Sequence, residues 1–151
     1  GNYSKNLKRN LKRAENHKMT LTSSIKVEKL VEMYRTHQGP KIPELGDAAY
    51  HAAHRVIYNA LHRGMGFMSA ITNEQNDFLA AGFFLVSKNR IVNLLPTTTA
   101  EGREKRAMHV LLDMTIQQNA LNQRSLILKV RLFLVLQNFT KVLERRINRI
   151  R

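Results

Sequence analysis

One stretch decides the fold: AGFFLVSKNRIVNLLPTTTAEGREKRAMHVLLDM, residues 81–114. An apolar run passes through a short polar turn into a second apolar run, and a threonine-rich segment then leads into a helical pattern. Apolar runs bounded by turn residues are typical of buried strands. We therefore predict strands over residues 78–86 and 90–95, joined by a tight hairpin turn at 87–90, where Asn89 tolerates positive φ.

The segment PTTT at residues 96–99 lies where the second of these strands gives way to a predicted helix over residues 100–120. Thr98 and Glu101 match the capping box, in which a threonine and a glutamate three residues later satisfy the first amides of a helix. A turn between a strand and a helix can also hold a phosphate. The spacing favours a helix cap over a phosphate site.

Three helices are predicted ahead of this stretch. The first spans residues 3–17 and carries a narrow apolar stripe on a basic surface. The second follows Ser23 and Ser24, which can act as N-caps, and ends near the stop signal Gly39-Pro40. The third spans residues 47–62 and ends before Gly64.

Shorter segments complete the prediction. Residues 19–22 form an extended piece, residues 65–71 a strand, and residues 125–128 a further strand. The predicted fold class is mixed α/β, with a mainly antiparallel central sheet flanked by helices.

Composition limits the class of protein. The chain has 151 residues, 43% of them hydrophobic, which is enough for one globular domain with a core. The net charge of +14 is concentrated at the ends: residues 1–18 contribute +5 and residues 129–151 contribute +6. The chain has no cysteine, so disulfides and thiolate chemistry are excluded. No apolar run is long enough to span a membrane, and we expect a cytoplasmic location.

Antiparallel strands followed by a helix and a parallel strand resemble the centre of the GNAT acyltransferase fold. The segment YSKNLKRNLKRA at 3–14 is similar to the Y-x-K-x-x-R-x-N-x-x-K-A helix that opens the second GNAT-like domain of Fem-type peptidyltransferases. The segments AAGFF at 80–84, RIVNLL at 90–95 and AMHVLLD at 107–113 resemble the same domain of Fem-like proteins.

The resemblance extends from residue 3 to about residue 128. It implies a single GNAT-like domain over residues 1–151, with a basic helix at 1–18, a core at 19–128 and an atypical tail helix at 129–151. In Fem-type enzymes this is one half of a longer, two-domain transferase, so a first GNAT-like domain would be missing here.

The tail departs from the family after residue 128, where the chain reads LKVRLFLVLQNFTKVL over residues 128–143. With suitable codons for residues 128–145, a shifted reading frame encodes FEGSSIPGVAKFYKSFGA, the end expected of the family. We interpret the tail as frameshifted from about residue 128. As written, its apolar residues repeat at helical spacing and predict a C-terminal amphipathic helix that can support a homo-oligomer.

The chemistry that the resemblance implies is attack of an amine on an activated acyl group, with acetyl-CoA or aminoacyl-tRNA as donor. GNAT enzymes bind the pyrophosphate of CoA through R/Q-x-x-G-x-G/A at the turn from strand to helix. Here that motif is incomplete, and Glu101 and Glu104 would repel a pyrophosphate. The candidate cofactor-binding residues at this turn are Thr97, Thr98, Thr99, Gly102 and Arg103.

Two further residues are candidates for catalysis. Asn93 lies at the end of the preceding strand, and His109 lies near the start of the helix, where it is either a general base or a structural histidine. Other polar residues favour a solvated surface. His51 and His54 have a spacing that can hold a metal, but no carboxylate partner is evident, and we predict a solvated helix face that also includes Arg55, Asn59 and His62.

The basic helix at the N-terminus is a candidate nucleic-acid surface. Five basic residues cover it and could contact tRNA or another polyanion, or simply be solvated: Lys5, Lys8, Arg9, Lys12 and Arg13. The predicted function is therefore that of an acyltransferase-like domain with an unknown amine acceptor. The alternatives are a non-catalytic domain that binds a polyanion or a protein, and an inactive truncated fragment.

Overall fold

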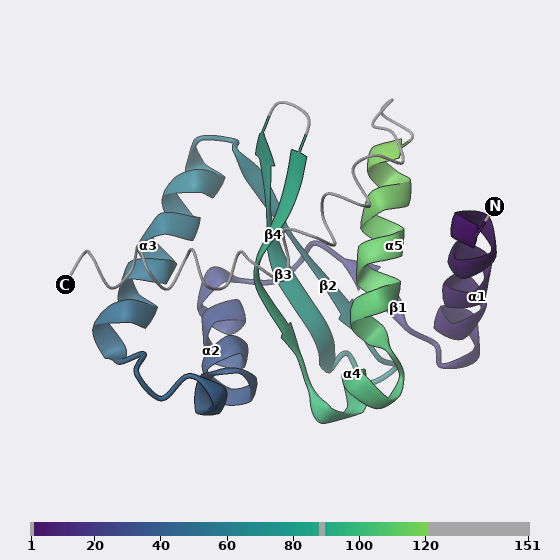
Figure 1. Cartoon of the computed structure of the whole chain (residues 1–151), viewed down its shortest axis with the longest axis horizontal. Coiled ribbons are helices and arrows are strands. Elements are labelled where there is room, and N and C mark those ends of the chain that lie inside the picture. Colours follow the sequence, from purple (N-terminus) through teal and green to yellow (C-terminus); the bar gives the residue numbers. More distant parts are fainter. Residues whose placement is uncertain (1, 88–89, 121–151) are drawn as a thin grey trace.

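A computed structural model describes residues 2–87 and 90–120 (Figure 1). The predicted strand at 125–128, the tail helix at 129–151 with its frameshift interpretation, and the turn residues Lys88 and Asn89 lie outside the described residues. Ser87 pairs with Arg90 on either side of that turn.

The centre of the fold is an antiparallel sheet in the order β1-β2-β3-β4. Its strands are β1 (Thr20–Thr22), β2 (Gly66–Thr72), β3 (Phe78–Ser87) and β4 (Arg90–Thr98). All three predicted strands of the core are confirmed. The extended piece at 19–22 is a short edge strand, because Thr20, Leu21 and Thr22 pair with the end of β2.

The helices are α1 (Asn2–Asn16), α2 (Val27–His37), η1 (Gly39–Lys41), α3 (Asp47–His62), α4 (Ala100–Glu104) and α5 (Ala107–Ala120). The predicted bounds of α3 are confirmed. The predicted caps of α2 are wrong, because the helix starts at Val27 after Lys26, which makes no side-chain cap. The amide of Ser24 donates to Thr22 Oγ1 at 3.0 Å, so this segment forms a local turn that delays the helix.

The long helix predicted over residues 100–120 is wrong in one respect: it is broken into α4 and α5. Arg106 has φ of +53°, in the left-handed region that a continuous helix does not use. The break redirects the chain, and α5 then runs along the sheet (Figure 1). Neither glycine nor proline stands at the break, so no stop signal in the sequence marks it.

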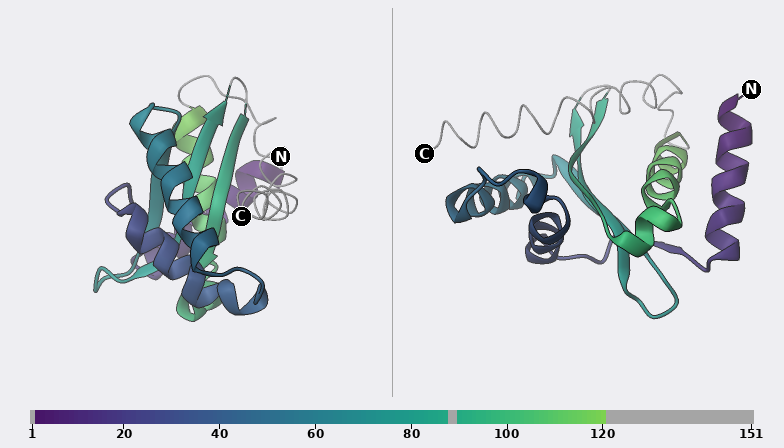
Figure 2. Two further views of the ribbon diagram at one scale, coloured as in Figure 1. Left: turned by 90° about the vertical axis from the view of Figure 1, so that its left-hand side faces the viewer. Right: turned by 60° about the horizontal axis from the view of Figure 1, so that its bottom comes forward.

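Helices cover both faces of the sheet (Figure 2). α2 and α3 pack on one face, in a core that includes Ala81, Phe83 and Leu94. α5 packs on the other face, in a core that includes Ala80 and Phe84. Phe83 and Phe84 are both fully buried, one on each face, which confirms that β3 is covered on both sides. Each buried phenylalanine contributes about 1.5–3 kcal/mol.

α1 forms an outer layer against α5, on the side away from the sheet (Figures 1 and 2). Its inward face carries the buried Ala14 and the buried Asn10, whose amide donates to the carboxylate of buried Asp113 on α5. Arg13 Nη1 donates to Asn10 Oδ1 at 2.7 Å. A buried carboxylate needs such partners, so this polar contact fixes where α1 lies along α5.

The close approach of α4 to β3 depends on Gly102. A Cβ on Gly102 would lie 2.0 Å from the carbonyl oxygen of Leu79 and 2.9 Å from Thr98 Cγ2. No real Cβ tolerates that distance to a backbone oxygen, so only glycine lets the helix pack this closely.

We expect Gly102→Ala to lower the free energy of unfolding by about 3 kcal/mol, because α4 must move away from β3 to make room. Urea denaturation monitored by circular dichroism measures the change. Gly64→Asn is the matched control: Gly64 has φ of +67° but no atom within 4 Å of its Cβ position, so asparagine should cost about 1 kcal/mol or less. Equal destabilisation by the two variants would contradict the packing argument.

Candidate functional site

The candidate site is the region where β4 passes into α4. The predicted loop at residues 96–99 is mostly strand, since β4 continues to Thr98 and Thr97 and Thr98 pair with Ala81 and Ala80. The strand extends three residues beyond its predicted end at residue 95, which the sequence places there because Pro96 and the threonines have the composition of a turn.

A β-bulge interrupts β4 just before these threonines. Phe83 pairs with Leu94 and Ala81 pairs with Thr97, so Leu95 and Pro96 together stand opposite Gly82 alone. Two residues against one is the definition of a bulge, and proline is tolerated there because it has no amide to pair. Leu95 has φ of +53°, a left-handed conformation that costs a leucine roughly 1–2 kcal/mol.

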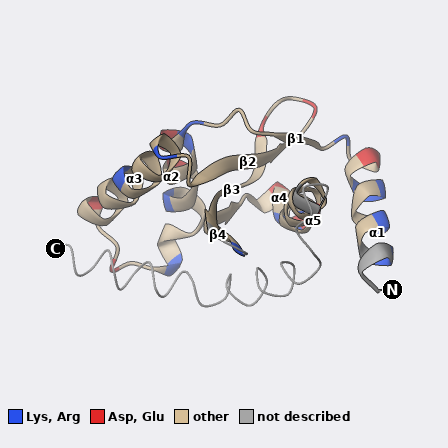
Figure 3. Cartoon of the chain, turned by 90° about the horizontal axis from the view of Figure 1, so that it is seen from above, with Lys and Arg blue, Asp and Glu red and all other residues tan. Residues whose placement is uncertain are grey.

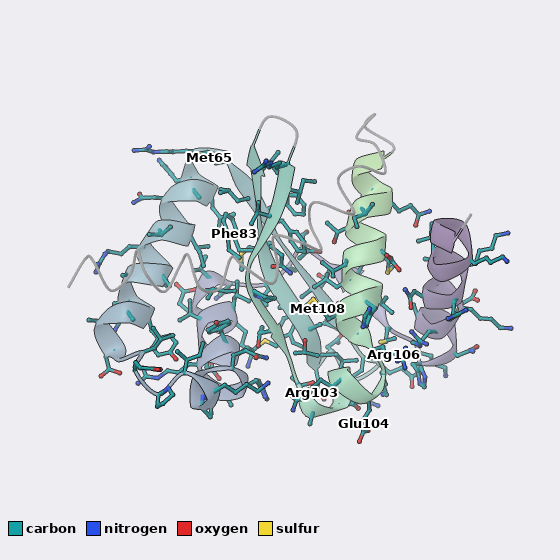
Figure 4. The ribbon with its side chains drawn as sticks, in the orientation of Figure 1. Met65, Phe83, Arg103, Glu104, Arg106 and Met108 are labelled. Atoms are coloured by element: carbon teal, nitrogen blue, oxygen red, sulfur yellow. The ribbon has the colours of Figure 1, made fainter. Side chains whose placement is uncertain are left out.

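Asn93 lies fully buried next to this bulge. Its Nδ2 lies 3.9 Å from Met108 Sδ on α5, and its Oδ1 has no hydrogen-bond partner among the residues that the structure describes. Figure 4 shows Met108 between α5 and the sheet. A buried carbonyl without a partner costs about 1–3 kcal/mol. Its position depends on Gly82, where a Cβ would lie 2.1 Å from Asn93 Oδ1.

The three threonines have different environments. Thr97 is fully buried, its Oγ1 makes no hydrogen bond within the described ranges, and it pairs with Ala81 on the face covered by α2 and α3. Asn93 pairs with Phe84 on the face covered by α5, so Thr97 and Asn93 point to opposite sides. Thr98 is partly buried beside Gly102.

The residue that caps α4 is Thr99, and the predicted cap at Thr98 is wrong by one position. Thr99 Oγ1 accepts a hydrogen bond from the Gly102 amide at 3.0 Å. The predicted box partner Glu101 contacts other groups: its carboxylate accepts from Asn73 Nδ2 at 3.1 Å and from Lys105 Nζ at 3.2 Å. The Gly102 amide is therefore engaged by the cap in this conformation.

Arg103 and His109 lie on the surface. Arg103 is exposed on α4, and Figure 4 shows it beside Glu104 at the lower end of the molecule. His109 is exposed on α5, whereas Asn93 is buried beneath that helix, and no hydrogen bond joins these two residues in the described part of the chain. The cofactor candidates thus lie at one end of β4, but Thr97 faces the α2–α3 side whereas Arg103 is exposed on α4. Of the two catalytic candidates, Asn93 is buried and His109 is exposed.

Three residues that shape this region are not predicted from the sequence. The bulge contains Leu95 at positive φ, and Asn93 is positioned by Gly82 and Met108. None of these three is among the candidate site residues from the sequence. A glycine inside an apolar strand does signal a bulge, so Gly82 was detectable. The left-handed Leu95 carries no such signal.

The polar face of α3 is exposed as predicted at His51, Arg55, Asn59 and His62. His54 has a carboxylate partner that its position in the sequence did not reveal: its Nε2 lies 3.2 Å from Glu28 Oε1 on α2. Nowhere in the described ranges do three metal-ligating side chains gather.

The basic face of α1 is open to solvent. Lys5, Lys8, Arg9 and Lys12 are exposed, and Figure 3 shows this basic surface along the helix. Arg13 differs because it is only partly exposed and bonds to Asn10. The candidate polyanion surface therefore consists of four side chains and a fifth that also holds α1 in place.

No family model matches the chain, and no curated protein or solved structure was found to match it. None of the helices in the described part of the chain is long and apolar enough to cross a membrane.

We expect Gly82→Ala and Asn93→Ala to be strongly coupled. Gly82→Ala alone should lower the free energy of unfolding by about 2 kcal/mol, because the new methyl group meets Asn93 Oδ1. In an Asn93→Ala background the obstacle is absent, so the added cost should fall below about 1 kcal/mol. Urea denaturation of the four proteins in this cycle gives the coupling energy. Additive effects would show that Asn93 does not occupy the space in front of Gly82.

Proposed function

We propose that this chain is an acyltransferase-like domain of GNAT topology that transfers an acyl group to an amine. The single observation that carries the proposal is the bulge of β4 at Leu95 immediately before the strand enters α4. A bulge interrupts the ladder of hydrogen bonds and redirects backbone groups, and bulges are common next to active sites. An acyl donor whose chain contains amide groups can form hydrogen bonds with backbone groups that the bulge leaves without a partner strand.

In this proposal the donor lies along the end of β4, and its phosphates contact the side chain of Arg103. The Gly102 amide is bonded to Thr99 Oγ1, so a phosphate would use that amide only by displacing the cap. Thr97 and Thr98 shape the end of the strand that carries the donor. Glu101 and Glu104 oppose an anion here, and Lys105 pairs with Glu101, so we assign the phosphate contact to Arg103.

The reaction is attack of the amine nitrogen on the carbonyl carbon of the donor. The new C–N bond forms as the thioester C–S bond, or the ester C–O bond of an aminoacyl-tRNA, breaks, and the nitrogen gives up a proton. His109 is the proposed acceptor of that proton, since a neutral imidazole can act as a general base. Asn93 is assigned a positioning role because it is fully buried and lies against Gly82, the residue opposite the bulge.

Acetyl-CoA binding and turnover test this function. We expect calorimetry to show saturable binding of acetyl-CoA, with about tenfold weaker binding for Arg103→Gln because glutamine cannot form the charge-assisted hydrogen bonds of a guanidinium. Release of CoA in the presence of an amine panel can be followed with a thiol reagent, since the protein has no cysteine to give a background.

The control for Arg103→Gln is Arg63→Gln, which removes an exposed arginine at the end of α3. Equal weakening in both variants would mean that only general charge attraction is measured. Absence of both acetyl-CoA binding and tRNA binding would leave the inactive fragment as the better description.

A specific observation favours a second candidate function, binding of a polyanion through α1. Four exposed basic side chains lie on the helix, while its inward face is anchored to α5 through Asn10. A helix held in this way presents its charges on a fixed surface. An RNA phosphate backbone is the chemistry that such a surface matches, through salt-sensitive contacts.

We expect the triple variant Lys8→Glu, Arg9→Glu, Lys12→Glu to weaken tRNA binding and to flatten its salt dependence. Every basic side chain that contacts a phosphate contributes about 0.7–0.9 to the slope of log K against log salt, so the triple variant should lower the slope by about 2. Arg13 is left unchanged because it bonds to Asn10. The control is Lys26→Glu, Lys41→Glu, Arg63→Glu, which changes the charge equally at exposed positions outside α1. Equal effects of the two triples would refute a specific surface on α1.

A further inference from the structure

A shallow cavity lies between α2 and α3. It has a volume of about 450 Å³ and is lined by Glu28, His54, Arg55, Tyr58 and Asn59. Pockets for small molecules span roughly 300–1,000 Å³, so the size suits a small ligand. Every lining residue carries a polar group, and none belongs to the junction of β4 and α4.

Three residues of the cavity lining contact one another. Glu28 Oε1 lies 3.2 Å from His54 Nε2, and the His54 ring stacks on the Tyr58 ring with centroids 5.9 Å apart and an angle of 12° between the planes. The imidazole is thus held between a carboxylate of α2 and an aromatic ring one turn along α3. Tyr58 gives up little freedom when a ligand binds, because His54 already supports it.

The aromatic ring is also open to a ligand. Tyr58 is 58% exposed, which is high for a large aromatic side chain. The ring is therefore a platform on which a planar group can stack, as bases stack on tyrosine in nucleic-acid sites. The amide of Asn59 beside it can donate to and accept from the edge of a planar heterocycle.

The cavity lining contains one carboxylate, Glu28, and one guanidinium, Arg55. Glu28 is bonded to His54, and its pKa is lowered by a backbone hydrogen bond and by the hydrogen bond from His54. Arg55 is exposed and makes no ion pair with any residue in the described ranges. A guanidinium in this situation is well suited to a phosphate, which it can bind through two parallel hydrogen bonds.

We propose that this cavity binds a nucleoside monophosphate, whose base stacks on Tyr58 beside Asn59 and whose phosphate contacts Arg55. The ligand class follows from a platform, an amide and a guanidinium around a cavity of this size. The site is independent of acyl transfer and of the basic face of α1, because it uses none of their residues.

Calorimetry of the intact chain with adenosine 5′-monophosphate tests the proposal. We expect one saturable binding event that Arg55→Gln and Tyr58→Ala each weaken about tenfold, since one removes the phosphate contact and the other the stacking. Glu28→Gln should tighten binding severalfold, because it removes a negative charge from the lining of a cavity that takes up an anion. All three side chains are exposed, and circular dichroism verifies that each variant folds.

The control variant is Arg63→Gln, which removes an exposed charge at the end of the same helix, outside the cavity, and should leave binding unchanged. Adenosine and inorganic phosphate, tested separately, should each bind more weakly than the nucleotide. The proposal is overturned by an absence of saturable binding or by equal weakening in Arg55→Gln and Arg63→Gln. It is also overturned if adenosine or inorganic phosphate binds as tightly as adenosine 5′-monophosphate.

Discussion

The carbonyl oxygen of Leu79 is the group on which the second half of the fold depends. It accepts hydrogen bonds from the Thr99 amide at 3.0 Å and from Thr99 Oγ1 at 3.3 Å, and Gly102 packs directly against it. Three contacts at one atom fix the end of β4 and the start of α4 onto β3. Because β3 is buried on both faces, this anchor cannot shift without opening the core.

The consequences follow along the chain from this anchor. Once α4 is fixed, the left-handed Arg106 sets the direction of α5, and α5 places Met108 over Asn93. α5 in turn presents Asp113 to Asn10, so the position of the basic helix α1 depends on an arrangement that begins at Leu79. A surface formed by α1 is therefore coupled to the sheet through α5, which lies between the basic face and the sheet.

Sequence reasoning succeeds for elements whose pattern follows from burial and fails where local backbone strain decides. The apolar run that becomes β3 and the periodic residues of α3 predicted those elements well. A strand buried on both faces is apolar throughout, and a helix buried on one face repeats its apolar residues at helical spacing. The bulge at Leu95 and the break at Arg106 both put ordinary residues at positive φ, which tertiary contacts impose and composition does not reveal. The same reason explains the wrong cap at Thr98: its spacing to Glu101 fits, but the bulge upstream changes which threonine faces the first turn.

The candidate functional residues likewise divide into those that the sequence groups together and those that only the packed structure brings together. Thr97, Thr98, Thr99, Gly102 and Arg103 cluster because they are near in sequence, so grouping them needed no knowledge of the fold. Glu28 and His54 are 26 positions apart and meet only because α2 and α3 pack against the same face of the sheet. Sites built across helices, such as the cavity at Tyr58, therefore have to be sought in the packed structure, where a carboxylate that looks unpaired in the sequence is found beside its histidine. Within the described part of the chain, the sheet lies between that cavity and α5, so the core of β3 and β4 connects the cavity to the layer that carries α1.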